Sequence, residues 1–183
     1  ARTEVLSRRW RGLWARLPDL TFRYVPPGGI ETALSRVALP AVSLLDIRFR
    51  SFPPTEWGSA DDIRAKSLLR AAARLSPEEL VFVLPRPSTL KPDRPLKIAM
   101  PCFRRATSIE LDTCHLRLKP PLAGELPVLE RLSLSGNIVD LGTMISRCPR
   151  LRVLSVTFRD ADPDSLEAAL ASLEASAALG LVV

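Results

Sequence analysis

The chain has 183 residues, of which 46% are hydrophobic and 25% charged, so it can bury a core and is not disordered by composition. Its net charge of +6 comes mostly from the first 25 residues, and no basic stripe along the rest indicates a nucleic-acid groove. No run approaches the roughly 18 apolar residues of a membrane helix, and no secretory signal opens the chain. We expect a cytoplasmic or nuclear protein with no membrane partner, and the charge pattern does not favour a nucleic-acid partner.

The first segment, ARTEVLSRRWRGLWARLPDLTF (1–22), predicts an amphipathic helix. Thr3 is a candidate N-cap, and Pro18 follows the last residue of the pattern. One helical stripe collects the apolar residues Val5, Leu6, Trp10, Leu13, Trp14 and Leu17. Two tryptophans on a short helix form too large an apolar area to remain in water. The helix should therefore dock, either on the rest of the domain as a cap or on a partner protein.

Short segments with two apolar residues two positions apart recur along the rest of the chain and predict buried strands. These pairs are Leu45/Ile47, Leu80/Phe82, Ile109/Leu111, Leu132/Leu134, Leu154/Val156 and Leu179/Leu181. The last three steps between pairs are 23, 22 and 25 residues long, inside the roughly 20–29 residues of a leucine-rich repeat, whereas the earlier steps are 35 and 29. Asn137, and Cys114 at the equivalent position, are expected where the chain leaves the strand.

The segments between these strands predict helices or loops. Helical patterns cover 28–39, which ends before Pro40, and 59–75, and a third opens at Asp162-Pro163 and covers 164–173. The Pro-rich stretch 84–101 is interpreted as a surface loop, with a peptide ligand for an aromatic groove as the alternative. We therefore predict an α/β leucine-rich-repeat solenoid of about five or six repeats, with parallel strands and helical or irregular returns.

The residues that could support catalysis or metal binding are few. Cys102, Cys114 and Cys148 form no C-x-x-C pair and are interpreted as free buried thiols, and the single histidine, His115, follows Cys114 directly. The acids at 160, 162 and 164 lack the glycine and the final glutamate of a calcium loop. We expect no metal, no cofactor and no enzymatic activity.

The N-terminal residues and the repeats together resemble a known family. T-E-V-L-S-R-R-W-R-G-L-W-A-R-L-P-D-L-T-F resembles the closing part of a plant F-box motif, in which a V-L-S-[KR]-R-W-[KR]-x-L-W helix runs into L-P-x-L-x-F. R-A-T-S-I-E-L, L-E-R-L-S-L-S-G and R-C-P-R-L-R-V-L-S-V are similar to repeats of plant F-box/leucine-rich-repeat proteins. Because both modules occur in the expected order, the resemblance covers nearly the whole chain.

The resemblance implies the substrate-recognition subunit of an SCF-type ubiquitin ligase. Residues 1–25 would be the C-terminal part of an F-box motif and 26–183 the leucine-rich-repeat domain. The residues that would face the Skp-type adaptor, which links to cullin, are Val5, Leu6, Arg9 and Trp10, while Trp14 and Leu17 would turn toward the repeats. The opening L-P-x-[DE] segment of an F-box is missing, so the chain is expected to begin inside the motif and to bind the adaptor weakly or not at all.

The target protein should contact strand positions that alternate with the buried leucines. These positions are Glu110, Asp112, Ser133, Ser135, Ser155 and Thr157, and the alternative is that they form only a solvated sheet surface. Two other functions stay open. One is a binding-only repeat scaffold without ligase linkage, and the other is a nucleic-acid contact through the Arg-rich helix.

Overall fold

The computed structural model describes residues 13–23, 25–49, 59–84 and 96–158. A short 3₁₀ turn, Leu13–Arg16, precedes the first strand. The strands are β1 (Asp19–Arg23), β2 (Leu44–Arg48), β3 (Glu79–Val83), β4 (Lys97–Ala99), β5 (Ser108–Lys119), β6 (Arg131–Ile138) and β7 (Val153–Phe158). The helices are α1 (Pro27–Ser35), α2 (Ser59–Arg74) and α3 (Leu141–Ser146).

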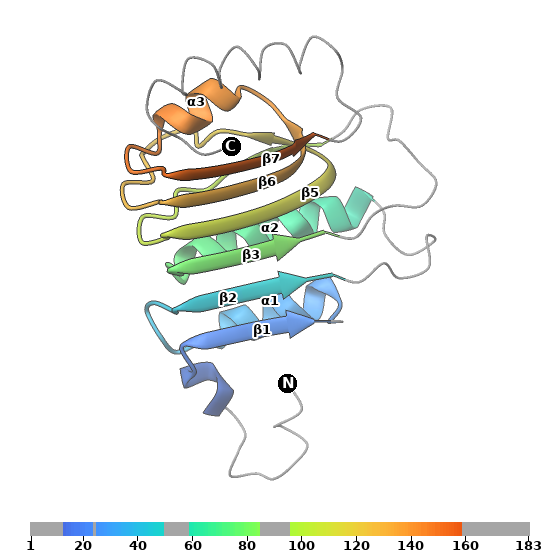
Figure 1. The fold of residues 1–183 in the computed structure, drawn as a ribbon. Coiled ribbons are helices and arrows are strands. Elements are labelled where there is room, and N and C mark those ends of the chain that lie inside the picture. Colours follow the sequence, from blue (N-terminus) through green and yellow to red (C-terminus); the bar gives the residue numbers. More distant parts are fainter. Residues whose placement is uncertain (1–12, 24, 50–58, 85–95, 159–183) are drawn as a thin grey trace.

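The strands form one seven-stranded sheet in the order β1-β2-β3-β5-β6-β7, with β4 paired to β5 (Figure 1). Every pairing is parallel. The main strands are therefore added one after another in chain order, and each must return to the same end of the sheet before the next begins. The prediction of an α/β fold with a parallel sheet is confirmed.

The register places the predicted apolar pairs in two continuous rows across the sheet. One row contains Leu20, Leu45, Leu80, Ile109, Leu132 and Leu154, each at most 4% exposed. The other contains Phe22, Ile47, Phe82, Leu111, Leu134 and Val156. Burying each large side chain contributes about 1.5–3 kcal/mol, and a one-residue slip of any strand would expose both of its members. The alternation of buried residues thus fixes the register.

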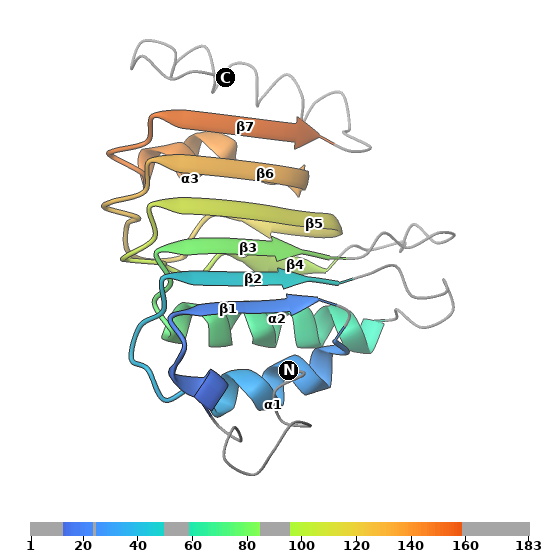
Figure 2. The ribbon, with the colours of Figure 1, turned by 60° about the horizontal axis from the view of Figure 1, so that its bottom comes forward.

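The helices cover one side of the sheet. Figures 1 and 2 show α1, α2 and α3 behind the strands, with no described helix on the opposite face. Proline opens α1 at Pro27, where a missing N–H costs nothing, and Ile30 and Leu34 are its buried residues. The predicted helices at 28–39 and 59–75 correspond to α1 and α2, although α1 already ends at Ser35.

Helix α3 was not predicted, and its cap explains its start. The Asp140 side chain accepts a hydrogen bond from the Thr143 backbone N–H at 3.0 Å, while Asp140 itself has a left-handed conformation with φ 59°. The hydrogen bonds from Thr143 lower the pKa of Asp140, because they stabilise its carboxylate. Aspartate suits this position, since its short side chain both tolerates positive φ and caps the helix.

Three expectations about strand ends and loops are wrong. Cys114 and Asn137 lie inside β5 and β6 rather than in turns, because both strands continue past the point where the neighbouring strands end. Between the pairs Asp112–Ser135 and Arg117–Asn137 the register shifts, so that four residues of β5 lie opposite one of β6. The Pro-rich stretch 84–101 is not a loop throughout, because its residues 97–99 form β4, in which Ile98 is buried.

The N-terminal segment also differs from its prediction. Asp19–Arg23, inside the predicted F-box segment 1–25, is strand β1 of the same sheet and pairs with β2 in register. Trp14 packs against the core as expected, but Leu17 is 51% exposed and does not turn toward the sheet, since the helical pattern stops at Arg16. The predicted third helix and the Leu179/Leu181 strand lie outside the described residues.

Candidate functional site

The side of the sheet away from the helices presents three rows of outward-facing residues, which we call the open face. Its first row contains Asp19, Leu44, Glu79, Ser108, Arg131 and Val153. The second contains Thr21, Asp46, Val81, Glu110, Ser133 and Ser155, and the third Arg23, Arg48, Val83, Asp112, Ser135 and Thr157. These positions alternate with the buried rows, so they lie on the opposite side of the pleat.

All six residues predicted to contact a target lie on the β5–β7 part of the open face. Glu110, Ser133 and Ser155 are neighbours in the second row, and Asp112, Ser135 and Thr157 are neighbours in the third. Ser155 and Thr157 on β7 are exposed, whereas the four on β5 and β6 are half-buried. Short hydroxyl side chains leave this part of the face flat and rich in hydrogen-bonding groups.

A charged network occupies the other end of the open face. Asp46 accepts hydrogen bonds from Arg23 Nη2 at 3.0 Å and from Arg48 Nε at 2.9 Å, using a different oxygen for each. Arg48 Nη2 lies 3.5 Å from Glu110 Oε2. The side chain of Asp46 is 8% exposed, whereas those of Arg23 and Arg48 are 58% and 41% exposed. A nearly buried carboxylate thus holds two surface arginines.

The network links β1, β2 and β5. It passes over β3, whose outward residues Val81 and Val83 lie between those of β2 and β5. The aliphatic parts of long arginine side chains can cover such apolar residues while the guanidinium groups remain in water. Each outward arginine also follows a buried pair directly, in Leu20-Thr-Phe-Arg23 and Leu45-Asp-Ile-Arg48. That repeated motif could have revealed Arg23, Asp46 and Arg48, which the sequence prediction missed.

The charges of the open face differ in sign from those of the whole chain. Its carboxylates are Asp19, Asp46, Glu79, Glu110 and Asp112, and its basic residues are Arg23, Arg48 and Arg131. The face therefore has a net negative charge, although the whole chain carries +6. A partner with a basic contact surface would complement this face electrostatically.

The predicted adaptor-binding residues Val5, Leu6, Arg9 and Trp10 lie outside the described residues. Cys102 and Cys148 are free, as predicted, but only Cys148 is fully buried. Burial raises the pKa of the Cys148 thiol to about 12, and its Sγ lies 3.2 Å from the Met144 carbonyl oxygen. Within the described ranges, no three His, Cys, Asp or Glu side chains gather as a metal site.

Comparison with known proteins gives no relative for this chain: no family model, no curated protein and no solved structure matches it. Among the described residues, no helix has the length and apolar character needed to cross a membrane.

Proposed function

We propose that this chain is a leucine-rich-repeat domain that holds a target protein on its open face and acts as the substrate-recognition part of an SCF-type ubiquitin ligase. The observation that supports the proposal best is the shared register of six parallel strands added in chain order. Repeated strands of this kind share one core between neighbours and leave a continuous sheet surface for binding.

The open face supports the target-binding part of the proposal. Its β5–β7 part carries Glu110, Asp112, Ser133, Ser135, Ser155 and Thr157, and the Arg23–Asp46–Arg48 network lies beside them. The net negative charge of the face favours a target with lysines or arginines at its contact surface. Target binding should therefore weaken as the salt concentration rises.

The ligase part of the proposal depends on the resemblance of residues 3–22 to the end of an F-box. The alternative is a binding-only repeat scaffold in which the same segment covers the end of the sheet. Both functions use the open face, but only the ligase function needs a Skp-type adaptor.

Binding of a purified Skp-type adaptor separates the two functions. The measurement compares the wild-type chain with Leu6→Ala and Trp10→Ala, using Leu122→Ala as a control because Leu122 is 85% exposed. The ligase function is supported if Leu6→Ala and Trp10→Ala each weaken adaptor binding about tenfold or more while Leu122→Ala leaves it unchanged. Equal adaptor binding by all four proteins would leave only the scaffold.

Target binding on the open face needs its own test. A photo-crosslinking residue at Ser155, on exposed β7, is compared with one at Ser146, which is exposed on α3. The proposal expects a target protein that crosslinks at Ser155 but not at Ser146. The ubiquitination of that target in cells should fall when the chain carries Trp10→Ala. A target crosslinked equally at both positions would contradict binding on the open face.

A further inference from the structure

The later part of β5 leaves the main sheet and forms a second, smaller strand group with β4 and the end of β6. Arg117–Lys119 pairs with Lys97–Ala99 on one side, and Arg117 and Leu118 pair with Asn137 and Ile138 on the other. Ile98, Leu118 and Ile138 are at most 6% exposed, so this row faces the core. The alternate residues therefore face outward, and we call them the β4–β6 outer patch: Lys97, Ala99, Arg117, Lys119 and Asn137.

Three of these five residues are basic, and they are close together. Lys97 and Arg117 are direct cross-strand partners, about 4.8 Å apart in a parallel sheet, and Lys119 lies two residues further along the same strand, about 6.6 Å away. Like charges at such positions repel one another and destabilise the pairing. Among the described residues, none of the three forms an ion pair that offsets this repulsion.

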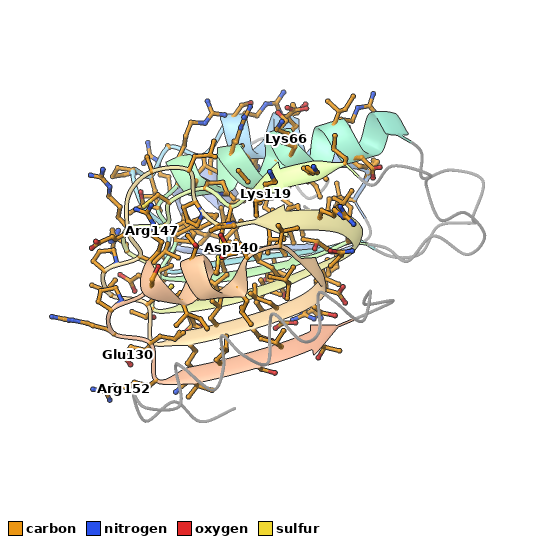
Figure 3. All side chains as sticks on the ribbon, turned by 90° about the horizontal axis from the view of Figure 1, so that it is seen from above. Lys66, Lys119, Glu130, Asp140, Arg147 and Arg152 are labelled. Carbon is orange, nitrogen blue, oxygen red and sulfur yellow. The ribbon has the colours of Figure 1, made fainter. Side chains whose placement is uncertain are left out.

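The acid that the fold brings to the edge of the patch, Asp140, is already engaged. The Val139 backbone N–H donates to the Leu118 carbonyl oxygen at 2.8 Å, which brings Asp140 to the edge of the patch. Its carboxylate, however, accepts the capping hydrogen bond from the Thr143 N–H. Figure 3 shows Lys119 and Asp140 on the same side of the molecule, and Lys66 of α2 adds a further positive charge there.

Arg117 carries an independent sign of a missing partner. Its Nε is shielded from solvent but has no hydrogen-bond acceptor. A buried donor without a partner costs about 1–3 kcal/mol, and more for a charged group, so such donors usually have an acceptor. Of the outward residues beside it, Lys97 and Lys119 carry ammonium groups that only donate, and the side-chain amide of Asn137 offers an uncharged acceptor oxygen.

We propose that the β4–β6 outer patch binds one phosphate group, as a dianion carried by a small molecule. A phosphate presents several acceptor oxygens and about two negative charges, which match three cations, whereas a carboxylate has one charge and two oxygens. The patch is about one strand spacing wide and two residues long, so it fits one phosphate group and not the repeated phosphates of a nucleic acid. This site lies apart from the open face and does not depend on the proposed function.

The test is calorimetric titration of the whole chain with inorganic phosphate at pH 8 and constant ionic strength. We expect one site, with affinity reduced at least about tenfold in both Arg117→Gln and Lys97→Gln, because each removes a charge-assisted hydrogen bond. Arg152→Gln is the matched control, since it removes the same charge from an exposed residue far from Lys119 in Figure 3. Lys97 is exposed, so its variant tests the site even where Arg117→Gln alters folding.

Two further titrations sharpen the result. Phosphate should bind more weakly at pH 5, where it is mainly a monoanion because its second pKa is about 6, whereas sulfate should bind equally at both pH values. No saturable binding by the wild-type chain would overturn the proposal, and so would equal affinities for Lys97→Gln and Arg152→Gln. Binding of single-stranded DNA without binding of phosphate would also overturn it, since that result indicates a polyanion surface.

Discussion

The carboxylate of Asp46 is the central group of the open-face network, so Asp46→Asn is the most informative stability variant. The substitution keeps the shape of the side chain but removes the charge that holds Arg23 and Arg48. Removing one partner of a fully buried ion pair costs about 3–5 kcal/mol, and an exposed pair is worth about 0.2–1 kcal/mol. Asp46 is nearly buried, but the arginines are 58% and 41% exposed, so solvent screens both pairs strongly. We expect a loss of about 1–2 kcal/mol.

Urea unfolding at neutral pH measures this loss, with Asp19→Asn as the control because Asp19 is an exposed acid on the same face. The control should change the unfolding free energy by less than about 0.5 kcal/mol. A double-mutant cycle with Arg23→Gln should give a coupling energy of about 0.5–1 kcal/mol between Asp46 and Arg23. A coupling energy near zero, or equal losses for Asp46→Asn and Asp19→Asn, would refute the reasoning that the buried carboxylate organises the network.

Three other stability predictions use the same unfolding assay. Thr113→Val should stabilise the protein by about 1 kcal/mol, because the Thr113 hydroxyl is buried without a hydrogen-bond partner, and destabilisation would show that it has one. Leu132→Ala should cost about 2–5 kcal/mol, because Leu132 is 1% exposed within a buried row, whereas Leu122→Ala should cost almost nothing at 85% exposure. Asp140→Ala should cost about 1–2 kcal/mol through the lost cap and the left-handed backbone. Because the pKa of Asp140 is lowered in the folded state, the stabilisation by the cap is present above the unfolded pKa of 3.8 and is lost as the pH falls through the folded pKa. If the difference in unfolding free energy between the wild-type chain and Asp140→Ala were unchanged at pH 2, this account of the cap would be wrong.

The spacing of apolar residues predicted the strands well, because the two-residue period of a strand is a local property of the sequence. Leu45/Ile47, Leu80/Phe82, Ile109/Leu111, Leu132/Leu134 and Leu154/Val156 all lie in the two inward rows. The same alternation placed Glu110 and Ser133 on the outward side. The role of an outward side chain could not be predicted in the same way, because the sequence does not reveal which residues of other strands lie beside it.

The strand Asp19–Arg23 shows why local patterns were insufficient at the N-terminus. Its apolar residues Leu20 and Phe22 have the same spacing as the other pairs, but the resemblance of the preceding residues to an F-box assigned them to a different module. Only its pairing with β2 shows that the sheet begins there. The pairing also brings Arg23 beside Arg48, and this makes a shared carboxylate at Asp46 favourable.

The sequence by itself therefore determined which residues face inward, where most of the strands lie, and that they form a parallel sheet with helical returns. Only the tertiary structure decided the continuation of β5 beyond Asp112, its register shift against β6, and its pairing with Lys97–Ala99. The physical reason is that alternation depends on neighbours in sequence, whereas register and ion pairs depend on contacts between residues far apart in the chain. The repeated motif points to Arg23, Asp46 and Arg48, but their ion pairs, like the grouping of Lys97 with Arg117, are visible only in the folded structure.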